Sequence, residues 1–350
     1  MPLSVQPRPR RRADEFRFIE TLRRRFGHTG RFVRGIGDDA AAVRLAAGQV
    51  LLITTDLLIE QVHFDFTTAT FEDVGYKAAV ANLSDIAAMG GRPEYLVVAI
   101  AIPQSRTQGE IIELYRGMML ACRQFGVELV GGDTSASPHS LFLCITMTGS
   151  VRSDWALTRD GARVGDFVYV TGALGDSLAG LDLLTQTGVD GPTLKQLNRQ
   201  LGPRAVQYLI DRHLRPTPRI KEAQWLSRYR LATAAIDLSD GLSGDLVHLC
   251  EQSGVGAEIE ISALPMSRAC RAYASFRRLD PSRMALKGGE DYELLFTVAP
   301  KKATALERLA KRMRLRWTRI GTILSKSSGR RIRTKTGAVQ RLPVLSYRHF

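Results

Sequence analysis

Strand-like and helix-like runs alternate along most of this 350-residue chain. Helix-like patterns occupy 72–90 and 109–126, and in the second the apolar residues recur at spacings of three and four, forming one face. Short runs rich in branched apolar residues predict strands around them, at 50–55, 95–102, 127–132 and 141–149. Because strands that alternate with helices build layered sheets, we predict an α/β (α+β) fold.

A second cycle of strand and helix begins near residue 165, with "GDFVYVTG" followed by "DSLAGLDLLTQTG". The polar stretch 151–166 is the best candidate for a boundary. A chain of this length can bury two cores. We therefore expect two α/β domains, 15–150 and 160–350, preceded by a basic, disordered arm at 1–14.

The net charge of +14 is unevenly placed. Residues 1–34 carry 10 Arg against 3 acidic residues, and 301–350 carry 15 Lys or Arg against one Glu, which leaves 35–300 with a net charge of −7. The basic ends make RNA binding an alternative from a different functional class. No aromatic RNA-binding signature or zinc-finger spacing accompanies them, so we do not expect nucleic acid as the main partner.

Three further features bound the class of protein. No apolar run approaches the ~18–20 residues of a membrane span, so we expect no membrane association. The N-terminal arginines are followed by no apolar segment, so we expect no signal peptide. The four cysteines are far apart, which fits a reducing cytoplasm and argues against a cysteine-ligated zinc.

Five aspartate-containing stretches share one design, in which an apolar run ends and Asp follows beside Gly, Ser or Thr. Each one alone is explained by helix capping, because Asp and Ser accept the free N–H groups of a helix start. A metal site is the other interpretation, and Asp85 favours it because its neighbours form an apolar helix-like run. The stretches are "GIGDDAAAV" (35–43), "ITTDLL" (53–58), "NLSDIAAMGG" (82–91), "VGGDTS" (130–135) and "IDLSDGL" (236–242).

Carboxylates combined with hydroxyls are ligands that Mg²⁺ selects, and Mg²⁺ commonly bridges protein acids to phosphate oxygens. The glycines beside these acids, such as Gly131 and Gly132, let backbone N–H groups approach a phosphate. There is no P-loop motif and no kinase-type glycine loop. The residues thus indicate an enzyme of nucleotide phosphates that uses several Mg²⁺ ions.

Nine motifs in sequence resemble those of the thiamine-monophosphate kinase family, within the superfamily of aminoimidazole ribonucleotide synthetase. The resemblance runs from about residue 15 to the last residue. The motifs are "GIGDDAAAV", "TTDLLIEQVHF", "YKAAVANLSDIAAMGG", "GGDTS", "ALTRDGARVGDFVYVTGALGDS", "RHLRPTPR", "AIDLSDGLSGDL", "GGEDYELLFTV" and "SYRHF".

The resemblance implies a homodimer whose N-terminal domains form much of the dimer sheet. It implies ATP-dependent phosphorylation of thiamine monophosphate to thiamine diphosphate, the last step of thiamine diphosphate biosynthesis. We expect direct in-line transfer without a phosphoenzyme. The alternative within the superfamily is a selenophosphate or purine-biosynthesis synthetase. A selenophosphate synthetase would need a reactive cysteine near the N-terminus, but the first cysteine here is Cys122. The hydrogenase-maturation member ends in a cysteine, whereas this sequence ends in Phe350.

The resemblance also implies roles for individual residues. Substrate contacts match His63, Glu290 and Tyr347. Of these, Tyr347 would stack on the positively charged thiazolium and Glu290 would complement the cation. Asp245 has no matching role and is expected to be structural. ATP contacts match Tyr115, Gly132, Asp133, Arg159 and Ser239. The catalytic residues would be Asp133, Arg159 and Asp240. Mg²⁺ ligands match Asp39, Thr54, Thr55, Asp56, Asp85, Asp133, Asp237 and Asp240.

Overall fold

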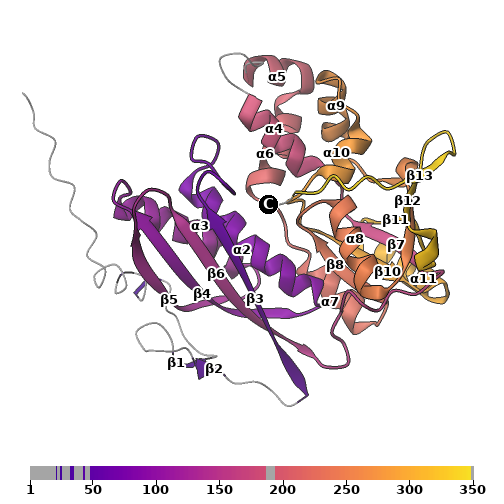
Figure 1. The fold of residues 1–350 in the computed structure, drawn as a ribbon. Helices are drawn as coiled ribbons and strands as arrows, with labels where there is room; N and C mark the ends of the chain where they lie inside the picture. Colours follow the sequence, from indigo (N-terminus) through magenta and orange to yellow (C-terminus); the bar gives the residue numbers. More distant parts are fainter. Residues whose placement is uncertain are drawn as a thin grey trace, which may run out of the picture. The chain divides into compact units, whose positions relative to one another are not determined.

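The computed structural model describes residues 48–186 and 194–347, and nearer the N-terminus 21, 24–25, 32–34 and 42–43 (Figure 1). The predicted arm at 1–14 lies outside the described residues. From residue 48 onward the chain forms two compact units. The first contains 55–78 and 95–146, and the second contains 48–54, 79–94 and the described residues from 147.

A four-stranded sheet forms in the N-terminal half of the chain, where the sequence predicts strands. Its β4 and β5 run parallel to each other, and α2 (Phe71–Ala88) and α3 (Gln108–Arg123) cover one of its faces (Figure 1). The strand order is β3 (Gln49–Ile59), β6 (Phe142–Arg152), β4 (Arg92–Pro103), β5 (Glu128–Ser137). A separate pair, β1 (Phe32–Arg34) and β2 (Ala42–Val43), is antiparallel.

Two glycines allow α2 and α3 to cross at close range. A Cβ atom on Gly75 would lie 1.8 Å from the carbonyl oxygen of Leu114, and one on Gly117 would lie 1.8 Å from that of Glu72. Only glycine is compatible with such an approach. At its start, α3 carries a reciprocal capping box between Thr107 and Glu110, which fixes where the helix begins.

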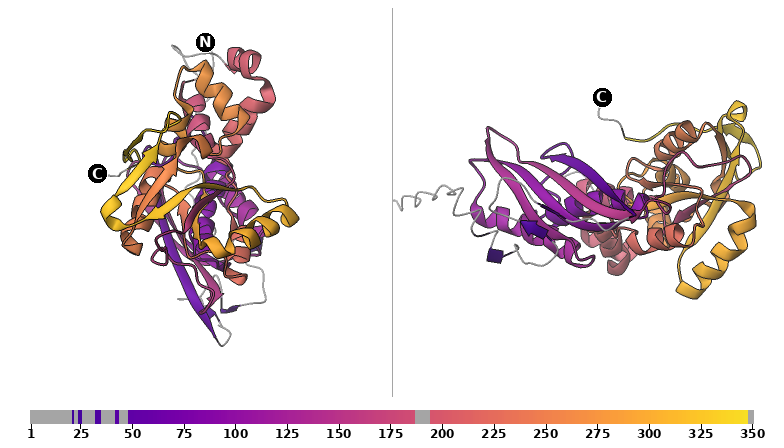
Figure 2. Two further views of the ribbon diagram at one scale, coloured as in Figure 1. Left: turned by 90° about the vertical axis from the view of Figure 1, so that its right-hand side faces the viewer. Right: turned by 90° about the horizontal axis from the view of Figure 1, so that it is seen from below.

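The second unit contains a seven-stranded mixed sheet (Figures 1 and 2). In this sheet β12 pairs with β9 in parallel, whereas β10 pairs antiparallel with both β7 and β8. The order is β13 (Val339–Arg341), β12 (Arg330–Arg333), β9 (Gly256–Glu260), β11 (Trp317–Leu324), β7 (Phe167–Thr171), β10 (Glu293–Val298), β8 (Ala234–Leu238).

Helices α8 (Leu242–Ser253) and α11 (Pro300–Met313) follow β8 and β10. Val168 and Val170 of β7 belong to one apolar core with Leu246 and other residues of α8. Tyr169 lies between them on the strand, and because successive side chains alternate, it points to the other face. There it stacks on Phe296 at 5.6 Å between ring centroids. Both faces of the sheet are therefore buried.

Helices at the top of Figure 1 form a second core in this unit, which includes Leu183, Leu197, Leu209 and Tyr273. The helices are α4 (Asp176–Gln186), α5 (Leu194–Leu201), α6 (Pro203–Leu214), α9 (Arg268–Phe276) and α10 (Pro281–Lys287). Helix α7 (Ile220–Arg228) lies between α6 and β8 in sequence.

Part of the basic C-terminal region serves the sheet itself. Arg331 and Arg333 of β12 both pair with Glu258 of β9, at 2.8 and 2.7 Å. Arg330 pairs with Glu251 of α8 at 2.8 Å.

The predicted mixed α/β architecture is confirmed. Among the residues that the structure describes, no helix is long and apolar enough to cross a membrane.

Candidate functional site

The stretch 236–242 joins β8 to α8 through a tight turn, and the structure separates its acids by role. Asp237 is the last residue but one of β8 and has a buried side chain. Its Oδ2 accepts a hydrogen bond of 2.8 Å from the hydroxyl of Ser84 on α2. The N-cap of α8 is Gly241, at φ 113°, with no side-chain cap at that position. Instead Asp245, one turn into the helix, accepts the N–H of Gly241 at 3.0 Å. Capping therefore explains Asp245, as predicted, and not Asp237.

Acidic side chains lie close together at this turn. Burial raises the pKa of Asp245 well above its usual value, and the nearby Asp237 and Asp240 raise it further. Burial also raises the pKa of Asp85, although a hydrogen bond from the Thr54 hydroxyl and the positive charge of Arg159 act against this. A bound cation would favour the ionised forms of both carboxyl groups, which burial disfavours and which, for Asp245, the neighbouring acids disfavour as well. The donor set of acids and hydroxyls fits Mg²⁺.

The acids do not form a ready-made metal cage. Within the described part of the chain, no group of three or more His, Cys, Asp or Glu residues is arranged to hold a metal ion. Mg²⁺ commonly keeps only one or two protein carboxylates and completes its shell with water and phosphate oxygens. The arrangement thus fits a cation that arrives with a phosphate better than a permanently caged one.

Backbone hydrogen bonds gather four predicted site residues at the end of β8. The N–H of Glu290 donates to the carbonyl oxygen of Ser239 at 2.8 Å, and the N–H of Tyr347 donates to that of Asp240 at 3.2 Å. The C-terminal segment is also anchored where the N–H of Leu345 donates to the Ser243 hydroxyl at 3.0 Å. Ser239, Asp240, Glu290 and Tyr347 are therefore neighbours, and the Tyr347 side chain is 50% exposed.

Arg159 lies in the exposed loop that leads into the second predicted domain. The loop is tied to the end of α8, because the Ser253 hydroxyl donates to the Arg159 carbonyl oxygen at 2.7 Å and accepts the N–H of Ala162 at 3.1 Å. The Arg159 guanidinium lowers the pKa of Asp85 against the effect of burial. Arg159 therefore belongs to the same charged neighbourhood as Asp85.

In the first unit, Gly132 and Asp133 lie on β5. The register of β5 against β4 shifts between Leu96 and Val97, which is an irregularity of the kind that redirects side chains. A Cβ on Gly132 would lie 2.0 Å from the carbonyl oxygen of Val98, so glycine is required there. Asp133 follows directly and is exposed. The glycine next to Asp133 thus has a packing role in the sheet.

Strand β3 separates the predicted metal ligands Thr54, Thr55 and Asp56. Because side chains alternate along a strand, Thr54 and Asp56 share one face and Thr55 points to the other. On that other face the hydroxyl of Thr146 donates to that of Thr55 at 3.1 Å. The Thr55 side chain therefore does not join those of Thr54 and Asp56, while Thr54 donates to Asp85.

The remaining predicted residues differ in accessibility. The Nδ1 of His63 accepts the N–H of Ile59 at 3.0 Å, and the residue is half-buried. Tyr115 on α3 is only 2% exposed, and burial raises the pKa of its hydroxyl. Its contact with a nucleotide stays a prediction. Asp39 lies outside the described residues.

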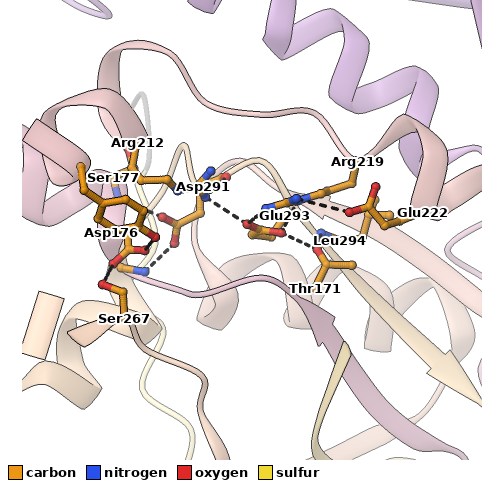
Figure 3. A network of polar contacts seen from close by, with 12 residues as sticks. Thr171, Asp176, Ser177, Arg212, Arg219, Glu222, Ser267, Asp291, Glu293 and Leu294 are labelled. Carbon is orange, nitrogen blue, oxygen red and sulfur yellow. Dashed lines mark hydrogen bonds and ion pairs between the residues drawn. The ribbon is translucent and has the colours of Figure 1, made fainter. Parts of the chain in front are cut away.

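A buried polar network beside Glu290 was not predicted from the sequence (Figure 3). It centres on Glu293, whose side chain pairs with Arg212 at 3.0 Å and with Arg219. The motifs "RHLRPTPR" and "GGEDYELLFTV" contain these residues, but nothing in either string indicates that they meet. The signal that was available is that one motif carries three arginines and the other carries three acids.

Sequence models of one family match most of the chain. The model described as AIR synthase related protein, N-terminal domain, matches residues 37–151, and that of the C-terminal domain matches 163–333. The chain belongs to the AIR synthase related protein family. Its two family regions meet within the polar stretch at 151–166.

Within the AIR synthase related family, the chain is similar to thiamine-monophosphate kinases. It is 35% identical over 339 residues to the thiamine-monophosphate kinase of Bacillus subtilis (strain 168), covering 96% of this chain and 99% of that protein. The crystal structure of the enzyme from Stenotrophomonas maltophilia K279a superposes with a TM-score of 0.79 at 36% identity, covering 94% of this chain and 98% of that one. A structure described as AaThiL complexed with AMPPCP and TMP superposes with a TM-score of 0.74 at 33% sequence identity, covering 96% of this chain and 97% of that one.

Proposed function

We propose that this protein is a thiamine-monophosphate kinase, which transfers the γ-phosphoryl group of ATP to thiamine monophosphate and yields thiamine diphosphate and ADP. The observation that carries the proposal is the meeting of Ser239, Asp240, Glu290 and Tyr347 at the end of β8. Acidic ligands for a phosphate-bound cation and groups suited to an organic cation are thus side by side. Relatives that share this activity match nearly the whole chain.

The acceptor carries both a thiazolium cation and a phosphate, and different residues suit each part. The Glu290 carboxylate, one-third exposed, offers a negative charge to the cation. The half-exposed Tyr347 ring can stack on the thiazolium. We assign His63 to the acceptor as well, because it matches an acceptor contact of the kinase family that the sequence resembles.

Several Mg²⁺ ions would be held by acidic residues, and Mg²⁺ supplies positive charge that would offset the repulsion between two anionic phosphates. In the second unit Asp85, Asp237 and Asp240 are the proposed ligands, with the hydroxyl of Thr54. Asp56 and Asp133 are the proposed ligands of the first unit, with Thr55 through its backbone oxygen and Asp39 as a further acid. Arg159, Ser239, Gly132 and Tyr115 are proposed to contact ATP.

The chain needs no strong general base for this reaction. The attacking oxygen belongs to a phosphate monoester, which is mostly ionised near neutral pH. A bond forms between that oxygen and the γ-phosphorus while the bond from the γ-phosphorus to the β–γ bridging oxygen breaks, and ADP leaves. Arg159 would stabilise charge on the transferred group, and Asp133 and Asp240 would position it. We therefore propose direct in-line transfer.

A homodimer is proposed from the outer face of the four-stranded sheet, which carries exposed apolar side chains. Ile53 and Leu57 of β3 are 66% and 51% exposed, and Phe142 of β6 is 36% exposed. Large exposed apolar side chains gathered on one face indicate an interaction surface. A second copy of this chain is the proposed occupant, in the cytoplasm, where the acceptor and ATP are both available.

The test is product analysis with purified protein, Mg²⁺, ATP and thiamine monophosphate. We expect thiamine diphosphate and ADP in equal amounts. The competing assignment is a selenophosphate or purine-biosynthesis synthetase of the same superfamily. ATP turnover with selenide or a purine precursor, and none with thiamine monophosphate, would favour that assignment and contradict ours.

A further inference from the structure

The segment that presents Glu290 adopts an unusual backbone. Glu290 and Tyr292 have φ angles of 59° and 49°, in the left-handed region that favours glycine. Two such residues so close together need surroundings that hold them in place, and held backbone strain of this kind is concentrated at functional sites. The question is which residues hold this segment.

Asp291 and Glu293 are fully buried and anchor the segment from within (Figure 3). The Asp291 carboxylate accepts the N–H groups of Gly175 and Ser177 at 2.6 and 3.0 Å, at the start of α4. The Glu293 carboxylate accepts the Thr171 hydroxyl at 2.5 Å. Both side chains are thus fixed to elements far away in sequence.

Two arginines complete the anchor. Arg212, near the end of α6, donates to the Asp291 carbonyl oxygen at 2.9 Å and to the Glu293 carboxylate at 3.0 Å. Arg219 donates twice to the same carboxylate, from Nε at 2.6 Å and from a terminal nitrogen at 2.5 Å. Burial alone would raise the pKa of Glu293, but Arg219 and Arg212 together lower it. Figure 3 shows Glu293 between the two guanidinium groups.

His213 follows Arg212 on α6 and reaches Glu290 itself. Its Nδ1 lies 3.5 Å from Glu290 Oε2 and 3.1 Å from the Ser177 hydroxyl, and its ring is buried. Close packing sets its position, because a Cβ on Gly180 would lie 2.9 Å from His213 Cβ and 2.1 Å from the Leu209 carbonyl oxygen. Two successive residues of α6 therefore hold the backbone and the carboxylate of the same segment.

We propose that Arg212 and His213 are positioning residues for the phosphate acceptor. Arg212 fixes the segment that contains the left-handed residues Glu290 and Tyr292, through Asp291 and Glu293. His213 orients the Glu290 carboxylate toward the acceptor's cation. This inference rests on the proposed function and extends it. It predicts that the two residues set the affinity for the acceptor and leave the affinity for ATP unchanged, because their contacts reach the site through Glu290.

Steady-state kinetics on the full-length protein test this inference. For Arg212→Met and His213→Leu we expect the KM for thiamine monophosphate to rise on the order of tenfold and the KM for ATP to change less than about twofold. Arg212→Lys and His213→Asn should recover part of the loss, because each keeps a polar group at the contact. The double variant Glu290→Gln/His213→Leu should be no worse than Glu290→Gln alone, since residues that act through one another are not additive.

The control is Glu258→Gln on β9, which also removes a carboxylate paired with two arginines of the same sheet. It should lower thermal stability and leave both KM values as in the wild type. The inference is overturned if Arg212→Met and His213→Leu raise both KM values equally or neither. It is also overturned if the double variant is additive, or if Glu258→Gln raises the acceptor KM as well. A wild-type protein that does not phosphorylate thiamine monophosphate would instead overturn the proposed function, and this inference with it.

Discussion

Asp291 should make the stability of this protein depend on pH in a direction opposite to that of an ordinary salt-bridged carboxylate. Its side chain is 1% exposed. Burial raises its pKa to about 7, against the opposing effects of Arg212 and the N–H groups of Ser177 and Gly175. A carboxyl group whose pKa is raised in the folded state stabilises that state when protonated. Its contribution is complete below the unfolded pKa of 3.8 and is lost as pH rises through about 7.

The expected magnitude follows from the two pKa values. Each unit of pKa difference corresponds to roughly 1.4 kcal/mol, so between pH 5 and pH 8 the contribution of Asp291 should fall by about 2.5 kcal/mol. Asp291→Asn cannot titrate and should lose this dependence. The free energy of unfolding of the wild type minus that of Asp291→Asn should therefore decrease by this amount over the interval.

Urea unfolding at several pH values, followed by tryptophan fluorescence, measures this difference. Glu293 supplies the control, because it is equally buried, yet Arg219 and Arg212 lower its pKa. Its contribution is present above the unfolded pKa of 4.5 and is lost only as pH falls through the folded value. The free energy of unfolding of the wild type should therefore exceed that of Glu293→Gln by about 3–5 kcal/mol at every pH between 5 and 8, since that variant leaves two arginines without their carboxylate. If the difference between the wild type and Asp291→Asn were also independent of pH, burial would not raise the pKa of Asp291 as described.

Three further predictions concern packing, charge and assembly. Gly132→Ala should lower the free energy of unfolding by about 1–3 kcal/mol or more, because its Cβ would lie 2.0 Å from the Val98 carbonyl oxygen. Gly131→Ala should change the free energy of unfolding little, because its Cβ would lie 3.8 Å from Val97 Cγ1. Equal melting temperatures for the two variants would contradict this. Asp85→Asn should reduce Mg²⁺-dependent turnover at least tenfold without lowering the melting temperature, because burial already disfavours the charge of Asp85. A lower melting temperature with turnover intact would support a structural role instead. Leu57→Asp should halve the mass of the protein measured by light scattering. Val164→Asp, at a position that is 64% exposed, should leave that mass unchanged. An unchanged mass for Leu57→Asp would count against the proposed dimer surface.

The strands and helices could be predicted where local pattern determines them. The alternation of branched apolar runs with helical periodicity locates β3 to β6 together with α2 and α3, because burial of one face imposes that pattern on neighbouring residues. Asp245 could be assigned a structural role for the same reason, since its partner Gly241 is four residues away. These contacts are local, and local sequence suffices for them.

The site could be predicted only in part, because its other contacts join residues far apart in the chain. Arg212 meets Glu293 across 81 positions and Ser84 meets Asp237 across 153, and no local pattern encodes either pair. The opposite orientation of Thr54 and Thr55 follows from strand alternation once β3 is known. The resemblance named both threonines together because a family motif records identity and not direction.

Direct transfer at the end of β8 is tested by following the label of γ-³²P-ATP in the presence of thiamine monophosphate, with the wild type and Asp240→Asn. We expect one labelled phosphate per thiamine diphosphate formed and no label on the protein. We also expect that Asp240→Asn loses at least about a hundredfold in turnover while unfolding at the same temperature as the wild type. Label retained on the protein along the reaction path, or full turnover by Asp240→Asn, would contradict direct transfer at the end of β8.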